Sequence, residues 1–304
     1  MSRLMATYVD SFITDIIADH REVIALDQED HETLVKVLKG RELESSLQVP
    51  NFHVCTECGS RVVAVRVRRA STARQLSSLV PIVELENTLP STSDLKKAGE
   101  AAAEIRSEVE GLEKVGEIVV VQLDLSSLQS IRECAGHILK TEKMVHILVN
   151  NAGVCYCPKG YTRDGFELHI GINHLGHFLF TCLLLPRIIR SAPARIVTVS
   201  SYKGNVAQGI YLDDLHWEKR PYNPFEAYSE SKLANVLFST ELSRRLEGKG
   251  VTTYAVHPGV VATDAGRYAD MSFFPGARWL FENVLVYIIK TPEQGAQTTI
   301  HCAV

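Results

Sequence analysis

Glycine is scarce at the start of this chain of 304 residues: the first 93 contain only Gly40 and Gly59. Glycine lets a backbone approach a phosphate group closely, and a helix N-terminus behind such a turn offers free N–H groups. Two isolated glycines cannot build a strand, a glycine-rich turn and a helix in succession. The sequence therefore predicts that the first 93 residues contain no glycine-rich phosphate-binding turn.

Long apolar runs, a signal peptide and an excess of basic residues are also absent. No stretch reaches the eighteen or more apolar residues of a membrane span. The net charge of −4 provides no basic surface for a nucleic acid. Seven cysteines, an odd number without a signal peptide, predict reduced thiols. These absences predict an intracellular protein, cytoplasmic or peripheral on an organelle membrane, that binds no nucleic acid.

The cysteines do not form a complete metal site. Cys55 and Cys58, with His53 nearby, have the spacing of half a zinc knuckle. A structural zinc ion needs four ligands, and no second pair follows at a suitable distance along the chain. Cys155 and Cys157 are interpreted as loop thiols rather than ligands. The sequence therefore predicts no bound metal.

Residues 1–92 form an atypical N-terminal segment. Residues 9–40 combine helical apolar spacing with many acidic groups, which predicts one or two amphipathic surface helices. Residues 60–69 favour a solvated charge run, with a basic strand as the alternative. Serine, threonine and proline in residues 71–94 indicate a linker-like end. The second unit, residues 93–304, contains the regular patterns of a globular core.

Strands and helices alternate from residue 116 onwards. The valine-rich run 116–125 predicts a buried parallel strand, and Ser126 or Ser127 is the expected N-cap of the next helix. Further strands are predicted over residues 145–149, 194–201 and 251–256, with helices between them. This alternation is typical of an α/β fold with a doubly wound, Rossmann-like parallel sheet.

Polar and small residues gather at the predicted carboxyl edge of this sheet. They are Asp124, the turn Asn150-Asn151-Ala152-Gly153, Ser201 and Pro258-Gly259, each directly after a predicted strand. Ligands of open α/β sheets bind beyond the carboxyl ends of the strands. The sequence therefore predicts a ligand site at this edge.

Tyr228 and Lys232 lie four residues apart on a predicted helix, so both side chains can face one cleft. A free tyrosine has a pKa of about 10 and is a poor base at neutral pH. A lysine cation nearby favours the phenolate and lowers that pKa, as a general acid/base requires. The pair predicts proton transfer to or from a hydroxyl or carbonyl oxygen.

Each of these residues also has a purely structural interpretation. Asn151 and Gly153 suit a turn that ends a strand, and Ser201 suits a cap. Asn173 can be a polar residue inside a helix. Tyr228 can pack on a helix surface while a neighbouring lysine extends its stem along it. Their common order along the chain favours the functional interpretation.

The motifs ILVNNAGV, NHLGHFLF, AYSESKLANVLF and HPGVVATDAGR occur in the order found in the short-chain dehydrogenase/reductase family. From about residue 93 to the end, the chain resembles this family and is most similar to its retinol-dehydrogenase-like branch. The resemblance implies an oxidoreductase that transfers a hydride between a nicotinamide cofactor and a hydrophobic alcohol or aldehyde, such as a retinoid. It also implies a preference for NADP(H) over NAD(H).

The resemblance implies a catalytic role for each matching residue. Tyr228 would be the acid/base, and Lys232 would lower its pKa and bind the nicotinamide ribose. Ser201 would hold the substrate oxygen, and Asn173 would fix a water of the proton relay. The implied cofactor-binding residues are Asp124 at the adenine edge, Asn151, Ala152 and Gly153 at the adenosine ribose, Tyr228, Lys232, Pro258, Gly259 and Thr263.

The chain departs from the family pattern at both ends. The first βαβ unit is missing or replaced, and the last strand of the sheet is truncated after Val304. The alternative function is therefore a non-catalytic remnant that binds or dimerises but cannot hold the cofactor. Residues 271–290 join aromatic, aliphatic and basic residues, which favours a substrate lid first and a peripheral membrane contact second. The family also leaves a homodimer open, through residues 166–190 and the helix of Tyr228.

Overall fold

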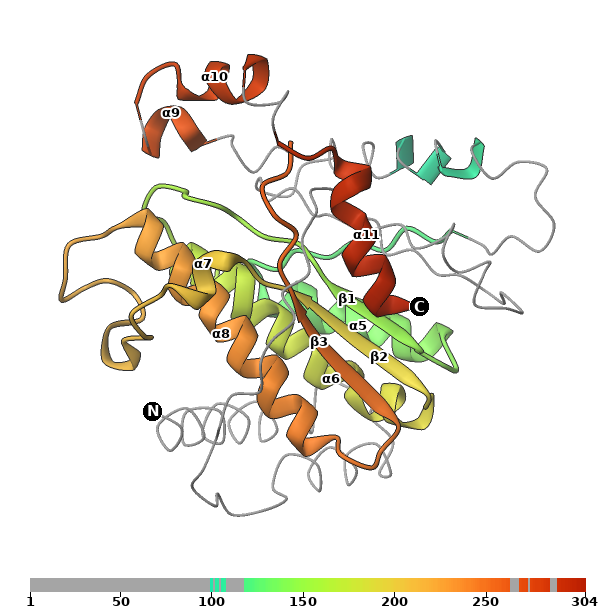
Figure 1. Ribbon diagram of the computed structural model, residues 1–304. Coiled ribbons are helices and arrows are strands. Elements are labelled where there is room, and N and C mark those ends of the chain that lie inside the picture. Colours follow the sequence, from blue (N-terminus) through green and yellow to red (C-terminus); the bar gives the residue numbers. More distant parts are fainter. Residues whose placement is uncertain are drawn as a thin grey trace.

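A computed structural model describes residues 99–100, 102–103, 105–107, 118–262, 268–272, 274–284 and 289–304. Its sheet has three parallel strands in the order β1 (Ile147–Asn150), β2 (Ala194–Val199) and β3 (Val251–Val256). The helices are α5 (Leu128–Thr141), η1 (His169–Gly176), α6 (His177–Arg190), α7 (Tyr202–Asn205), η2 (Leu212–Asp214), α8 (Pro224–Arg245), α9 (Ala269–Ser272), α10 (Ala277–Asn283) and α11 (Pro292–Ala303) (Figure 1). The predictions for residues 1–92 lie outside the described residues.

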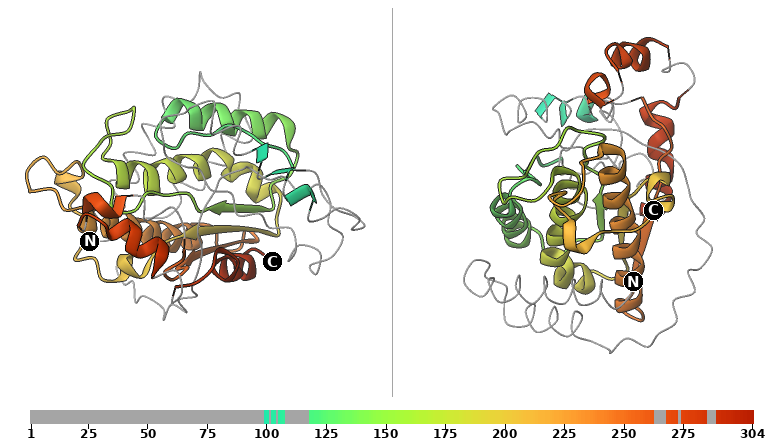
Figure 2. Two further views of the ribbon diagram at one scale, coloured as in Figure 1. Left: turned by 90° about the horizontal axis from the view of Figure 1, so that it is seen from above. Right: turned by 90° about the vertical axis from the view of Figure 1, so that its left-hand side faces the viewer.

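The sheet is buried on both faces, as the apolar runs of its strands predict. Leu148 and Ile196 point into one core with α5 and α6, while Val197 and Val199 point into a second core with Ala303 of α11. This alternation is the two-residue period of a strand. Figure 2 shows α5 and α6 on one side of the strands and α11 on the other. The α/β class and the parallel sheet are confirmed.

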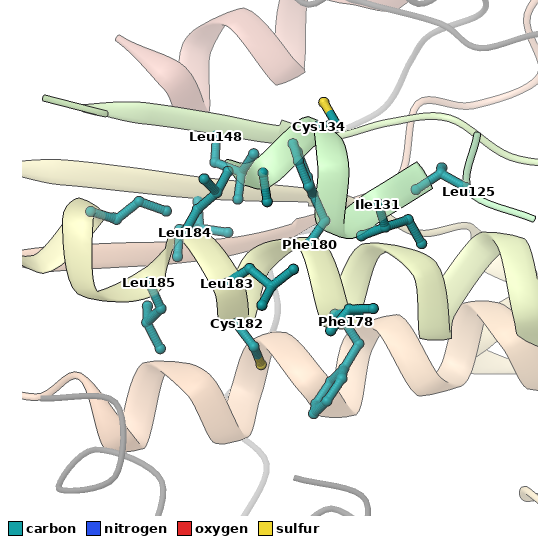
Figure 3. Close-up of a cluster of buried hydrophobic side chains, with 14 of the residues drawn as sticks. Leu125, Ile131, Cys134, Leu148, Phe178, Phe180, Cys182, Leu183, Leu184 and Leu185 are labelled. Atoms are coloured by element: carbon teal, nitrogen blue, oxygen red, sulfur yellow. The ribbon is translucent and has the colours of Figure 1, made fainter. Parts of the chain in front are cut away.

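The larger core is filled mainly by α6. Leu183 and Leu184 of this helix are at most 1 % exposed and lie between the sheet and its neighbours. Ile131 of α5 closes the core on one side, and Phe178 extends toward α8 on the other (Figure 3). One helical stretch, His169–Arg190, is long and apolar enough to cross a membrane by composition, contrary to the expectation from the sequence. Because 89 % of its apolar window is buried inside the protein, it serves here as a core helix.

Local signals set where the helices begin. Ser127 is the N-cap of α5, because its side chain accepts a hydrogen bond from the N–H of Ser130 at 3.3 Å. Asn223 caps α8 by accepting from the N–H of Phe225 at 3.0 Å, and Pro224 follows at the first helical position. The Asn223 cap sets the residue at which α8 begins and hence the face of the helix on which Tyr228 lies.

Two local predictions differ from the structure. The described part of the run 116–125 forms no strand, although Leu125 is buried and Val121 and Leu123 pack against the core. The apolar pattern correctly predicted that apolar side chains of the run contribute to the core. A strand also needs backbone hydrogen bonds to a neighbouring strand, and the run pairs with none among the described residues. The predicted helix 166–190 opens as a π-helix over η1, which is wider than an α-helix and is frequent at functional sites.

Candidate active site

Several of the predicted site residues lie beyond the carboxyl ends of the strands. The turn from Asn150 follows β1, Ser200 and Ser201 follow β2, and Pro258 with Gly259 follow β3. Helix α8 contacts β3, η1 and α7, and it brings Tyr228 and Lys232 to the same place. The crossover connections of a parallel sheet thus collect residues that are far apart in the sequence.

Lys232 is held almost completely inside the protein, with 4 % of its surface exposed. Its Nζ donates a hydrogen bond to the carbonyl of Val199 at 3.0 Å, and its own carbonyl accepts from Ser200 Oγ at 2.6 Å. Burial lowers the pKa of Lys232 to about 8. A Cβ at Gly204 would lie 2.8 Å from the backbone of Lys232, so only glycine allows α7 to approach α8 this closely.

Tyr228 lies beside this lysine, whose Nζ is 5.7 Å from the centre of the phenol ring. Burial raises the pKa of Tyr228 well above its ordinary value, and the neighbouring Cys155 adds to the shift, while the nearby Ser201 opposes it. The direction is opposite to the lowering that we predicted from Lys232. The reason is geometric: the ammonium group is directed to the carbonyl of Val199, and burial favours the neutral phenol.

Ser201 has the structural role that its position allowed. As the N-cap of α7, its Oγ accepts a hydrogen bond from the N–H of Lys203 at 3.2 Å. The same side chain also lies close enough to Tyr228 to lower the pKa of its phenol. The structural and the functional interpretation are therefore compatible at this residue.

Asn173 is fully buried in η1 and ties three segments together. Its Oδ1 accepts from the N–H of Val154 at 2.8 Å, and its Nδ2 donates to the carbonyl of Val154 and to Ser231 Oγ, both at 3.0 Å. A Cβ at Gly153 would lie 2.8 Å from Asn173 Oδ1 and 3.6 Å from Lys232 Nζ, so glycine is required there. The water-holding role of Asn173 stays a prediction.

The two carboxylate oxygens of Asp124 have different partners. Its Oδ1 accepts from the N–H and the Oγ of Ser126, at 2.9 and 2.6 Å. Its Oδ2 is buried without a hydrogen-bond partner among the described residues, although the guanidinium of Arg163 lies 3.4 Å away. A hollow of about 240 Å³ opens here, and Ser127 and Ser130 also line it. This arrangement can accept a hydrogen bond from a ligand.

The other predicted positions are placed with less detail. Asn151 and Ala152, the two residues that follow β1 in the chain, are buried. Gly259 has a φ of 90°, a left-handed conformation that favours glycine, and its N–H donates to the ring of His257 at 3.3 Å. Thr263 lies outside the described residues. Among the described residues, no group of three or more His, Cys, Asp or Glu side chains could hold a metal ion.

Two residues of the loop that follows β1 contact Tyr228, although no functional role was predicted for either. The ring of Tyr156 meets that of Tyr228 edge-on, with the centroids 5.0 Å apart. Cys155 lies close enough to Tyr228 to raise the pKa of its phenol, and burial raises the pKa of the Cys155 thiol to about 12. The one available signal was their position directly after the Asn-Asn-Ala-Gly turn, because a loop at that edge faces the ligand site.

Comparison with known proteins agrees with this geometry. A family model described as short chain dehydrogenase matches residues 92–212. Retinol dehydrogenase 11 (Homo sapiens) is 52% identical over 187 residues, which are 62% of this chain and 56% of that protein. Retinol dehydrogenase 12 (Homo sapiens) is 47% identical over 232 residues, 76% of this chain and 68% of that protein. The chain thus spans 56% and 68% of the length of these two relatives.

Solved structures share the fold. A crystal structure of an uncharacterised protein from Mycobacterium paratuberculosis is 35% identical, with a TM-score of 0.50 and coverage of 76% of this chain and 71% of that one. The RhlG/NADP active-site complex of Pseudomonas aeruginosa has a TM-score of 0.51 at 23% identity and covers 76% of this chain and 82% of its own. The second likeness concerns the fold alone.

Proposed function

Because the chain belongs to the short-chain dehydrogenase family, in its retinol-dehydrogenase-like branch, we propose that it is an oxidoreductase that moves a hydride between NADP(H) and a hydrophobic alcohol or aldehyde such as a retinoid. One observation carries this proposal: Tyr228, Ser201 and Lys232 lie together beyond the end of β2, where Ser201 influences the pKa of Tyr228 and Lys232 Nζ is 5.7 Å from the centre of the phenol ring. The preference for NADP(H) over NAD(H) follows from the branch that the chain resembles.

Tyr228 and Ser201 handle the substrate oxygen. In the reduction, Ser201 holds the carbonyl oxygen and Tyr228 protonates it; in the oxidation, Tyr228 removes the hydroxyl proton. The raised pKa of Tyr228 keeps its phenol protonated at neutral pH, which suits the acid role. Lys232, with a pKa of about 8, is mostly cationic at pH 7, and its ammonium lies 5.7 Å from the centre of the phenol ring. The bound cofactor supplies or accepts the hydride.

The described residues fit the two ends of a nicotinamide dinucleotide. The buried Oδ2 of Asp124, which accepts no hydrogen bond from the described residues and is paired only with the guanidinium of Arg163, suits the amino group of adenine. Asn151, Ala152 and Gly153 would line the adenosine ribose. Lys232 would bind the nicotinamide ribose, and Pro258, Gly259 and Thr263 would face the nicotinamide end. Residues 93–304 form the dehydrogenase core in this proposal, and residues 1–92 an appended segment.

The first experiment is a titration of the purified chain with NADPH and with NADH, followed by melting temperature. A ligand that binds only the folded state at a hundred times its dissociation constant adds about 2.7 kcal/mol of stability. We expect a saturable shift, larger with NADPH. The Tyr228→Phe variant should shift equally, but its turnover of a retinoid should fall about a hundredfold or more, the scale of general acid/base catalysis.

Two results would contradict the proposal. If a chain shown to be folded has no shift with either cofactor, it is the non-catalytic remnant, consistent with its lack of a glycine-rich turn in residues 1–93. If the cofactor binds and Tyr228→Phe turns over as fast as the natural chain, Tyr228 is not the acid/base.

We also propose two features of the surroundings of the site. Residues 271–290 form a lid over the hydrophobic substrate and, second, a contact with a membrane surface; Met271 of α9 and Trp279 of α10 are 72% and 63% exposed. A homodimer would form through residues 166–190 and α8, the helix of Tyr228. Helix α9 contacts the loop beside Tyr228, since Ser272 Oγ donates a hydrogen bond to the carbonyl of Tyr156.

A further inference from the structure

A buried polar network lies behind the loop that contacts Tyr228. His169 is fully buried, and its Nδ1 lies 2.9 Å from Glu167 Oε1. Its Nε2 accepts a hydrogen bond from the backbone N–H of Cys157 at 3.3 Å. The hydroxyl of Tyr222 donates to the carbonyl of Cys157 at 2.9 Å. The rings of His169 and Tyr228 meet edge-on, with the centroids 6.1 Å apart.

The hydrogen bonds determine which nitrogen of His169 carries the proton. A backbone N–H can only donate, so Nε2 must be the bare acceptor and the proton must lie on Nδ1, toward Glu167. Glu167 is a charged acceptor, because hydrogen bonds from His169 and from the N–H of Ile170 outweigh the effect of burial and lower its pKa. His169 therefore links a fixed carboxylate to the backbone of the loop.

The loop from Val154 to Cys157 needs such anchors. Tyr156, at its centre, has a φ of 50°, a left-handed conformation that is strained for a residue with a side chain. Asn173 holds the start of the loop through both backbone groups of Val154. At the other end, His169 holds the N–H of Cys157 and Tyr222 holds its carbonyl. Between these anchors, Cys155 and Tyr156 lie against Tyr228.

We infer that His169, oriented by Glu167, is a positioning residue for Tyr228, and that it acts by holding the loop of Cys155 and Tyr156 against the phenol. The inference rests on the proposed function, in which Tyr228 is the acid/base. A shift of the loop would change both the packing of the phenol ring and the space for the substrate oxygen. Misplacement by 1 Å from a residue that does not itself react can cost on the order of a hundredfold in rate.

Two substitutions of one residue separate positioning from packing. His169→Gln keeps an acceptor near the N–H of Cys157 but loses the link to Glu167. His169→Asn keeps a donor for Glu167 but is too short to reach the loop. Each variant loses one hydrogen bond, so both should be destabilised to a similar extent. The measurements are kcat and KM with NADPH and a retinoid aldehyde, and the rate at which iodoacetamide labels Cys155, resolved by peptide mass spectrometry.

We expect His169→Asn to lower kcat by tenfold to a hundredfold with a much smaller change in KM, and to speed the labelling of Cys155 severalfold. His169→Gln should retain most of kcat and the slow labelling. Equal behaviour of the two variants, in kcat and in labelling, would overturn the inference. If the natural chain shows no turnover, the proposed function fails, while the labelling still decides whether His169 holds the loop.

A further variant covers the case in which neither substitution of His169 folds. Tyr222→Phe removes the hydroxyl that donates to the carbonyl of Cys157 and that also lies 3.2 Å from Glu167 Oε1 and from His169 Nδ1. Its ring keeps the edge-on contact with Trp217, 5.6 Å between centroids. It should speed the labelling of Cys155 and lower kcat in the same direction, by a smaller factor. Labelling and kcat equal to those of the natural chain would then overturn the inference.

Discussion

At the scale of single residues, the site is dominated by the cost of burying charge. Tyr228 and Lys232 are both shifted toward their neutral forms: the pKa of the phenol is raised and that of the ammonium is lowered to about 8. The spacing of the pair predicted only their mutual attraction, which favours the charged forms. In the structure desolvation is the larger effect on each group, because the surrounding helices and strands exclude water.

The buried ammonium of Lys232 should make stability depend on pH. Its folded pKa of about 8 lies below the ordinary value, so the unfolded chain binds more protons between pH 8 and pH 10.5. The penalty for burying the cation is thus fully present below pH 8 and is relieved as the pH rises through this window. Lys232→Met removes the penalty, and the carbonyl of Val199 keeps its hydrogen bond from Asn235.

We therefore expect Lys232→Met to be more stable than the natural chain at pH 7, by about 1–3 kcal/mol, and the difference to shrink toward pH 10.5. Urea unfolding of both proteins at several pH values measures it, and the comparison cancels the titration of other groups. A difference that is constant with pH would show that the ammonium is not the cause.

At the scale of elements, α8 is held in place at its N-terminal half by the loop before it. Arg220 forms a bidentate pair with Glu230 of α8, at 2.6 and 2.9 Å, and its Nε lies 3.2 Å from Asp214. The guanidinium also stacks over Trp217 at 3.5 Å from the ring centre. Glu230 is two residues beyond Tyr228, so this clamp fixes the part of α8 that carries the phenol.

Breaking this clamp should destabilise the protein strongly. Arg220→Met keeps apolar contact with Trp217 but leaves Glu230, 6% exposed, without its partner, which should cost about 3 kcal/mol. The double variant Arg220→Met/Glu230→Gln removes the unpaired charge and should recover part of that loss. Chemical unfolding in a double-mutant cycle measures the coupling. Additive losses would mean that the two side chains do not stabilise each other.

At the scale of the whole molecule, the sequence predicted what short-range patterns encode. Strands β1 to β3 and helix α8 were expected at their observed places, because apolar runs and caps are local signals. The run at 118–124 was predicted to be a strand but forms none. A strand needs a neighbouring strand to pair with, and the residues of the run do not specify that neighbour. Likewise the network of His169, Glu167 and Tyr222 joins residues up to 55 positions apart, so no local pattern could predict it.

The region of α9 and α10 exposes apolar side chains that affect how the whole molecule contacts water or lipid. These helices lie apart from the sheet, close to the end of the molecule where the strands point (Figure 1). Met271, Phe274 and Trp279 are each more than half exposed, which is costly in water and favourable at a lipid interface. A lid that touches a membrane would take a hydrophobic substrate without its passage through water.

We expect the chain to sediment with phospholipid vesicles and Met271→Ser or Trp279→Ser to weaken the binding by roughly tenfold, because burying such a side chain contributes about 1.5–3 kcal/mol. Met144→Ser is the matched control: Met144 is 47% exposed, but it lies between α5 and β1, at the amino-terminal edge of the sheet and away from the lid. Equal loss in Met271→Ser and Met144→Ser would mean that the vesicles bind apolar surface without regard to place. Unchanged binding in both lid variants would remove membrane contact from residues 271–290 and leave them as a substrate lid alone.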